Sequence, residues 1–112
     1  MSKPRTMFDK IWDRHVILEE EDETLLYIDR CLIHEGSRHT FGKIDREGHS
    51  VAEPEKIFAF SDHYVPTTNR DKGLLGIYDS QIRGMVELLA SNCQRHGIQL
   101  FGIDDPRQGI LH

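Results

Sequence analysis

Cysteine is scarce in this sequence. Its two cysteines, Cys31 and Cys93, lie far apart, and neither has a second cysteine nearby. Disulfide-stabilised small proteins and metal sites of the Cys-x-x-Cys type need several or closely spaced cysteines, so neither class is predicted. We therefore expect both thiols to lie in the core, where free cysteine behaves as a small apolar side chain.

Basic charge and long apolar runs are also lacking. The chain has 14 basic and 19 acidic residues, which gives a formal net charge of -5, and the acids concentrate at residues 19–23. A nucleic-acid partner is not expected, because phosphate binding requires a basic stripe. No apolar run approaches the roughly 20 residues that span a membrane, and residues 1–5 lead into no signal-peptide core. We expect a cytoplasmic protein that does not bind membranes.

Two helices are predicted from capping residues and apolar periodicity. The first covers residues 8–15, behind a capping box that begins at Thr6. The second begins at Asp79 or Ser80, presents one apolar face, and ends at Gly97 in a left-handed conformation. Residues 38–55 have weak periodicity and several turn residues, so we expect at most one short helix there.

Short apolar segments predict strands between these helices. They lie at residues 25–28, 57–60 and 98–103, with a last extended segment at 109–112. Residues 65–76 are rich in turn formers and predict an exposed loop. The 112 residues are enough for one domain with one core. Strands that alternate with helices indicate an α/β layered fold.

A polar trio follows the strand predicted at residues 57–60. Ser61, Asp62 and His63 come directly after it, and ligands of open α/β sheets collect beyond the carboxyl ends of strands. A carboxylate beside an imidazole favours the protonated ring, so Asp62 and His63 are candidates for acid/base chemistry. Neighbouring side chains on extended backbone point to opposite sides, so a plain surface pair remains an alternative.

Histidine is abundant, with seven residues in the chain. Because His34, His63 and His112 each follow an apolar segment, we expect that they can gather at one sheet edge. No H-x-x-x-H or H-x-H spacing supports a preformed zinc site, and no metal ligands are predicted. Glu35 can contribute to such a site or can be a solvated loop carboxylate. The chain also lacks a G-x-S-x-G elbow and a glycine-rich phosphate loop.

Several strings in the chain together resemble a known family. They are FDKIWD at residues 8–13, LYIDR at 26–30, IHE at 33–35, DHYVPT at 62–67 and DPRQGILH at 105–112. In identity and order they resemble the beginning of the large subunit of 3-isopropylmalate dehydratases, in the aconitase superfamily. The resemblance implies that residues 1–112 are a single N-terminal segment of an aconitase-like α/β/α layered domain, without the remainder of that domain.

The resemblance also implies a reaction and a cofactor. The family interconverts 2-isopropylmalate and 3-isopropylmalate by dehydration and rehydration in leucine biosynthesis. Its Lewis acid is a 4Fe–4S cluster held by cysteine thiolates. Those cysteines lie in a later part of family sequences, and neither Cys31 nor Cys93 matches them. The chain is therefore expected to supply acid/base residues without cluster ligands, and to be inactive alone.

Individual residues take their implied roles from the matching strings. His63 is implied to protonate the leaving hydroxyl group, with Asp62 as its electrostatic partner. His112 matches another active-site histidine, and His34 falls near a substrate-binding position. The implied partners are a substituted malate, the remainder of the large subunit and a separate small subunit.

One string departs from the family pattern and leaves alternatives open. After His34 and Glu35 the chain continues with GSRHTF at residues 36–41, which is shorter than the usual family string and lacks its proline and glutamine. The substrate can therefore be homoaconitate or another substituted malate instead of isopropylmalate. A noncatalytic module that kept the fold and binds a partner is the alternative of a different class.

Overall fold

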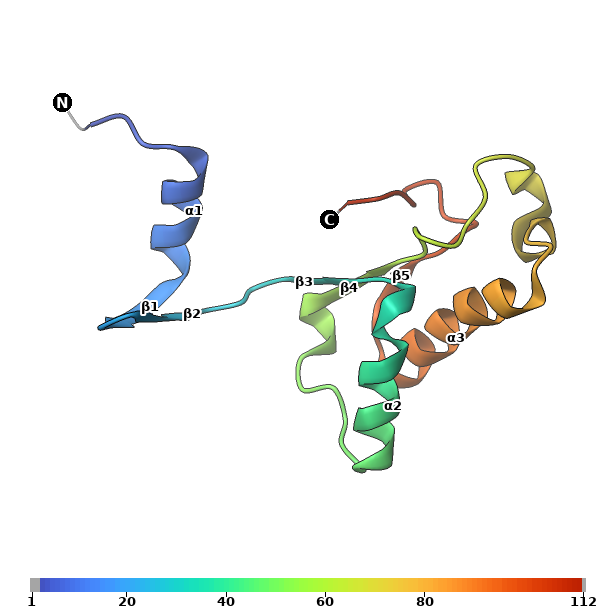
Figure 1. The fold of residues 1–112 in the computed structure, drawn as a ribbon, viewed down its shortest axis with the longest axis horizontal. Coiled ribbons are helices and arrows are strands. Elements are labelled where there is room, and N and C mark those ends of the chain that lie inside the picture. The colour runs from blue at the N-terminus through green and yellow to red at the C-terminus, as the bar shows by residue number, and fades with distance from the viewer. Residues whose placement is uncertain (1–2, 112) are drawn as a thin grey trace.

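The computed structural model describes residues 3–111 of the chain (Figure 1). Its helices and strands are α1 (Met7–His15), β1 (Val16–Glu20), β2 (Glu23–Leu26), β3 (Cys31–Ile33), α2 (Arg38–Arg46), β4 (Ile57–Phe60), α3 (Ser80–His96) and β5 (Gln99–Phe101). Three 3-10 turns accompany them, η1 (Glu35–Ser37), η2 (Pro54–Lys56) and η3 (Arg70–Gly76). The mixture of helices with small sheets confirms the predicted α/β class.

Strands β3, β4 and β5 form a parallel three-stranded sheet with β4 at its centre. Ile33 pairs with Ala59, and Ala59 pairs in turn with Leu100. Because all three strands run in the same direction, their carboxyl ends lie at one edge of the sheet. Helices α2 and α3 lie on the same side of the sheet (Figure 1). The chain segments that leave β3 and β4 therefore emerge close together.

The apolar core lies between this sheet and its helices. Its main cluster consists of buried side chains from α2, β4, α3 and the residue that precedes β5. These are Phe41, Ala59, Leu89, Cys93 and Ile98. A smaller cluster, formed by Ile77, Val86 and Ile103, packs at the other end of α3. Burial of these side chains is the main force that holds α3 on the sheet.

The predicted start and end of helix α3 are both confirmed. The Asp79 side chain accepts hydrogen bonds from the backbone N–H groups of Gln81 and Ile82, at 2.8 and 3.0 Å. Gly97 ends the helix with φ 70°, a left-handed conformation that glycine adopts without steric cost. The predicted strand at residues 57–60 is likewise confirmed as β4. These elements are encoded by local signals that the sequence displays.

The N-terminal helix leads into a hairpin that the sequence did not predict. The predicted capping box is confirmed, because Asp9 N–H donates to the Thr6 hydroxyl oxygen at 3.0 Å and Asp9 accepts from Thr6 N–H at 3.1 Å. Strand β1 then pairs with β2 in antiparallel fashion, with Glu20 opposite Glu23. The acidic run at residues 19–23 therefore lies in the two strands and in the turn between them. Strand β2 also lies two residues earlier than the predicted strand at 25–28.

Two further expectations are wrong. Cys93 is buried in the core, but Cys31 is exposed, because β3 is an edge strand and its first residue lies outside the helix-covered core. Residues 109–111 form no strand, since the described chain beyond β5 leaves the sheet through turns instead of pairing with it. In the predicted loop at 65–76, η3 provides a short helical turn.

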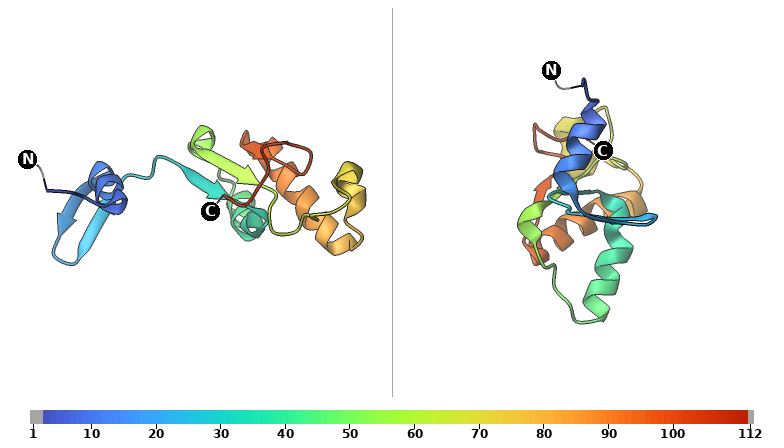
Figure 2. Two further views of the ribbon diagram at one scale, coloured as in Figure 1. Left: turned by 90° about the horizontal axis from the view of Figure 1, so that it is seen from above. Right: turned by 90° about the vertical axis from the view of Figure 1, so that its left-hand side faces the viewer.

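The N-terminal unit, which we define as residues 6–26, stands apart from the rest of the molecule (Figure 2). Residues 27–30 carry no regular secondary structure, and a hydrogen bond from Lys56 Nζ to Tyr27 Oη, at 2.7 Å, ties this link to the body. The Cα radius of gyration is 17.9 Å, whereas a compact chain of this length has about 13 Å. Among residues 3–111, no helix is long and apolar enough to cross a membrane.

Candidate functional site

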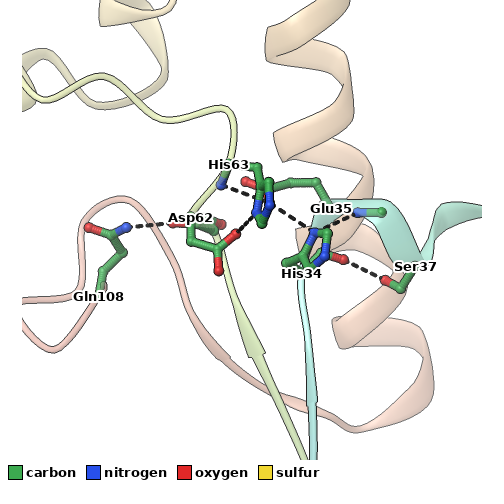
Figure 3. A network of polar contacts seen from close by, with 8 residues as sticks. His34, Glu35, Ser37, Asp62, His63 and Gln108 are labelled. Carbon is green, nitrogen blue, oxygen red and sulfur yellow. Dashed lines mark hydrogen bonds and ion pairs between the residues drawn. The ribbon is translucent and has the colours of Figure 1, made fainter. Parts of the chain in front are cut away.

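The candidate site lies where the chain leaves β3 and β4 (Figure 3). His34 and Glu35 follow β3, and Asp62 and His63 follow β4 after one intervening residue. The parallel pairing of these strands brings the two segments to the same edge of the sheet. The structure thus brings together His34, Asp62 and His63, three of the residues singled out from the sequence.

Asp62 and His63 contact each other directly, although they are sequence neighbours. His63 Nδ1 lies 2.5 Å from Asp62 Oδ1. The Asp62 side chain has no exposed area, whereas 44% of the His63 side chain is exposed. This hydrogen bond, opposed by desolvation, raises the pKa of His63 above its usual value, and the charges of Asp62 and Glu35 add to the rise.

The contact also assigns roles to the ring nitrogens of His63. A carboxylate can only accept, so His63 Nδ1 carries the proton that it donates to Asp62. In an imidazole that donates from Nδ1, Nε2 is the nitrogen at which the ring gains or loses a proton. A half-exposed imidazole anchored by a buried carboxylate in this way can act as a general acid or base.

His34 stacks on His63, with ring centroids 4.1 Å apart and planes inclined by 18°. It also caps the 3-10 turn η1, because its Nδ1 accepts a hydrogen bond from Gly36 N–H at 3.0 Å. Gly36 leaves room for the ring, since a Cβ there would lie 2.7 Å from His34 Cε1. A larger residue would therefore push the ring away from its stacked position.

Glu35 is a site residue whose placement the sequence left open between the site and solvent. Its side chain has no exposed area, because η1 packs against both α2 and α3. Its Oε2 accepts a hydrogen bond from His63 N–H at 3.3 Å and lies 3.9 Å from His34 Nδ1. Glu35 therefore touches both histidine segments. Its position directly after an apolar strand is the sequence signal that fits this placement.

The segment that follows β5 is hydrogen-bonded to the residue before Asp62. Gln108 Nε2 donates to the carbonyl oxygen of Ser61 at 2.6 Å, and Ser61 N–H donates to the carbonyl oxygen of Phe101 at 3.2 Å. Gln108 belongs to the string that ends in His112. His112 itself lies outside the described residues, so its predicted role stays a prediction.

The four groups also offer ligand atoms to a cation. One atom from each of His34, Glu35, Asp62 and His63 lies within 4.8 Å of the others. The hydrogen bonds nevertheless use both Nδ1 atoms, since that of His34 accepts from Gly36 and that of His63 donates to Asp62. A cation at either atom would have to displace one of these partners. The contacts of the two Nδ1 atoms thus serve to hold the rings in place within the chain.

An iron–sulfur cluster does not fit the residues that the structure describes. Such clusters are held by several cysteine thiolates. Cys93 is buried in the core, where burial raises the pKa of its thiol to about 11, and Cys31 lies on an edge strand. Neither belongs to the group around His34 and His63. Residues 3–111 therefore provide candidate acid/base residues, but no set of cysteine ligands for a cluster.

A protein-family model matches most of the chain. The family model described as "Aconitase family (aconitate hydratase)" matches residues 9–112. No solved structure matches the chain. The matched range contains both strand ends that build the site, as well as the helices that cover the sheet.

Proposed function

This chain belongs to the aconitase family, and from that premise we propose that it supplies acid/base residues to a hydro-lyase that interconverts 2-isopropylmalate and 3-isopropylmalate in leucine biosynthesis. The observation that carries the proposal is the buried Asp62 carboxylate on Nδ1 of the half-exposed His63 ring, at 2.5 Å. This pair favours the protonated form of a partly exposed imidazole, as protonation of a leaving hydroxyl requires.

In the proposed dehydration, His63 Nε2 donates its proton to the substrate hydroxyl group. The carbon–oxygen bond breaks, its electron pair stays with the oxygen, and water leaves. Asp62 keeps the ring oriented and stabilises its charged form before transfer. In rehydration, neutral His63 takes a proton back from water. The base that removes the carbon-bound proton is assigned to the remainder of the complete protein.

His34 is proposed to contact the substrate. Its ring lies against His63 and is 33% exposed, so a carboxylate or hydroxyl of a substituted malate can reach both rings together. Members of this family generally bind a 4Fe–4S cluster as their Lewis acid. In our proposal that cluster is held outside this chain, by the remainder of the large subunit, and a separate small subunit completes the enzyme. His112 is proposed as a further catalytic residue.

The proposal is tested in the assembled enzyme. Its other parts, the remainder of the large subunit and the small subunit, are sought by co-expressing the adjacent coding sequences with this chain. We expect His63→Ala to lower kcat by about 10²- to 10⁴-fold, the range of general acid catalysis, and to leave the absorption spectrum of the cluster unchanged. His49→Ala, at an exposed loop position, is the matched control and is expected to retain full turnover.

A panel of substituted malates, homoaconitate among them, then identifies the substrate. Faster turnover of isopropylmalate than of all other malates supports isopropylmalate as the substrate. Preference for another malate would identify that malate as the substrate, with the same role for His63. Normal turnover in His63→Ala would show that His63 is not the acid. Loss of the cluster spectrum would show that its role is structural.

A further inference from the structure

Glu35 combines deep burial with sparse hydrogen bonding. The residue is 1% exposed and its side chain has no exposed area. Oε2 accepts a long hydrogen bond, from His63 N–H at 3.3 Å, and buried Oε1 has no hydrogen-bond partner among residues 3–111. Burying a carboxylate with so few partners costs stability, so packing alone gives no reason for an acid here.

The groups that face Glu35 come from the two strand ends. On its own side, His34 Nδ1 lies 3.9 Å from Oε2. On the β4 side are the backbone and ring of His63, whose Nδ1 contacts Asp62, and Tyr64, whose ring centroid lies 6.4 Å from that of His63. The stacked imidazoles therefore lie next to two buried acids, Asp62 and Glu35, and one ligand atom from each of the four residues lies within 4.8 Å of the others.

This arrangement explains how the histidine pair can hold a proton. Two imidazolium rings at 4.1 Å would repel each other strongly, so the stack favours one proton at a time. Asp62 binds the proton on His63 Nδ1 directly. Glu35 adds a second negative charge, and its Oε2 also accepts a hydrogen bond from the backbone N–H of His63.

We propose that Glu35 is a positioning residue: it fixes the backbone of His63 through the N–H group and supplies the negative charge that keeps the proton on the His34–His63 stack. The inference deepens the proposed function and rests on it for its catalytic meaning. Its physical content, the influence of Glu35 on His63, is measurable in the 112-residue chain without substrate, cluster or partner.

The test uses NMR to follow the ring resonances of His63 as a function of pH, in protein that carries 13C-labelled histidine. Glu35→Gln keeps an amide oxygen that can accept from His63 N–H, but removes the charge. We expect the titration midpoint of His63 to fall by about half a unit to one unit, because a nearby negative charge is lost. Glu55→Gln, at an exposed position in η2, is the matched control and should leave the midpoint unchanged.

The contact with the backbone is tested separately. Glu35→Ala removes the acceptor of His63 N–H, and we expect the His63 amide to exchange with solvent about tenfold faster or more, as for a lost hydrogen bond. An unchanged His63 midpoint in folded Glu35→Gln, or unchanged amide exchange in folded Glu35→Ala, overturns the inference.

A measurement on the wild-type chain covers the case in which the variants do not fold. The carboxyl carbon of Glu35, labelled with 13C, should change its chemical shift in step with the titration of His63, because the Glu35 carboxylate is in contact with His63. A Glu35 signal that does not respond to the titration of His63 overturns the proposal. Failure of the assembled enzyme to turn over would instead concern the proposed function, because these titrations do not depend on it.

Discussion

Asp62 and His63 divide between them the two tasks of an acid/base pair. The carboxylate is buried and fixed, while the imidazole is half-exposed and can exchange its proton with a bound molecule. The hydrogen bond between them favours the charged ring, which raises the pKa of His63. The same contact links the stability of the fold to pH.

At the residue scale, this link predicts how Asp62→Asn destabilises the chain. A raised pKa in the folded state contributes stability that is fully present below the unfolded pKa of about 6.5, and is lost as the pH rises through the folded pKa. The difference in unfolding free energy between wild type and Asp62→Asn should therefore be larger near about pH 6 than near about pH 8.5. Urea titrations at both pH values measure it.

The control for this prediction is Asp22→Asn, in the exposed turn of the hairpin. It should show no such dependence on pH, because Asp22 lies far from His63 in the sequence and belongs to the separate N-terminal unit. A destabilisation by Asp62→Asn that is equal at both pH values would mean that the contact with His63 does not favour the charged ring in the folded state.

The sequence was informative about which site residues lie together, and less so about their burial. His34 and His63 each follow an apolar strand, so their meeting at one sheet edge was predictable from the α/β pattern. The burial of Glu35 was not, because it depends on how η1 packs against α2 and α3, and no local pattern reports that packing. The contact of Asp62 with His63 also required a bend in the chain after β4 that alternation alone does not predict.

At the scale of elements, local signals separate the correct predictions from the wrong ones. Helix α3 carries its own start at Asp79 and its own end at Gly97. The hairpin β1–β2 carries no such signal, because its turn has no glycine and Glu21 adopts a positive φ of 51° instead. The exposure of Cys31 followed from its place on an edge strand, which is a property of the whole sheet.

Two glycines of α3 give a prediction in which one chemical change has opposite effects. Gly97→Ala should lower the unfolding free energy by about 1 kcal/mol, because alanine is strained at φ 70°. Gly84→Ala should raise it by about 0.5–1 kcal/mol, because Gly84 is an exposed helix-interior position where a Cβ meets no atom within 4 Å. Urea unfolding followed by circular dichroism measures both. Changes of the same sign would contradict the assignment of Gly97 as the cap.

At the scale of the whole molecule, two parts differ in how they are stabilised. The body buries its apolar side chains between sheet and helices. The N-terminal unit leaves large apolar residues exposed, with Phe8 67% and Ile17 60% accessible to solvent, and α1 contains no buried residue. A short helix and a two-stranded hairpin are marginally stable by themselves.

This difference predicts two rates of amide hydrogen exchange in the 112-residue chain. Amides of α1, β1 and β2 should exchange quickly through local opening, while those of β4 and the middle of α3 should exchange only through global unfolding. Hydrogen exchange detected by mass spectrometry resolves the two regions. Equal protection in both would show that the N-terminal unit folds cooperatively with the body.

A core substitution sharpens this test. Leu89→Ala, at a position 2% exposed in the main cluster, should destabilise the body by about 2–5 kcal/mol. It should therefore speed exchange in α3 and leave α1 unaffected. Leu88→Ala, one residue away and 42% exposed, is the matched control, and should change neither region appreciably.

The parallel register of β3 with β4 has a consequence for the order of events during folding. His34 and His63 stack only after Ile33 has paired with Ala59, and closing a long crossover before that pairing is entropically slow. The backbone hydrogen bonds of helix α3 are local and can form earlier. The stacked imidazoles therefore report that two segments far apart in the sequence have met, and the acid/base pair gains its neighbour only with that tertiary pairing.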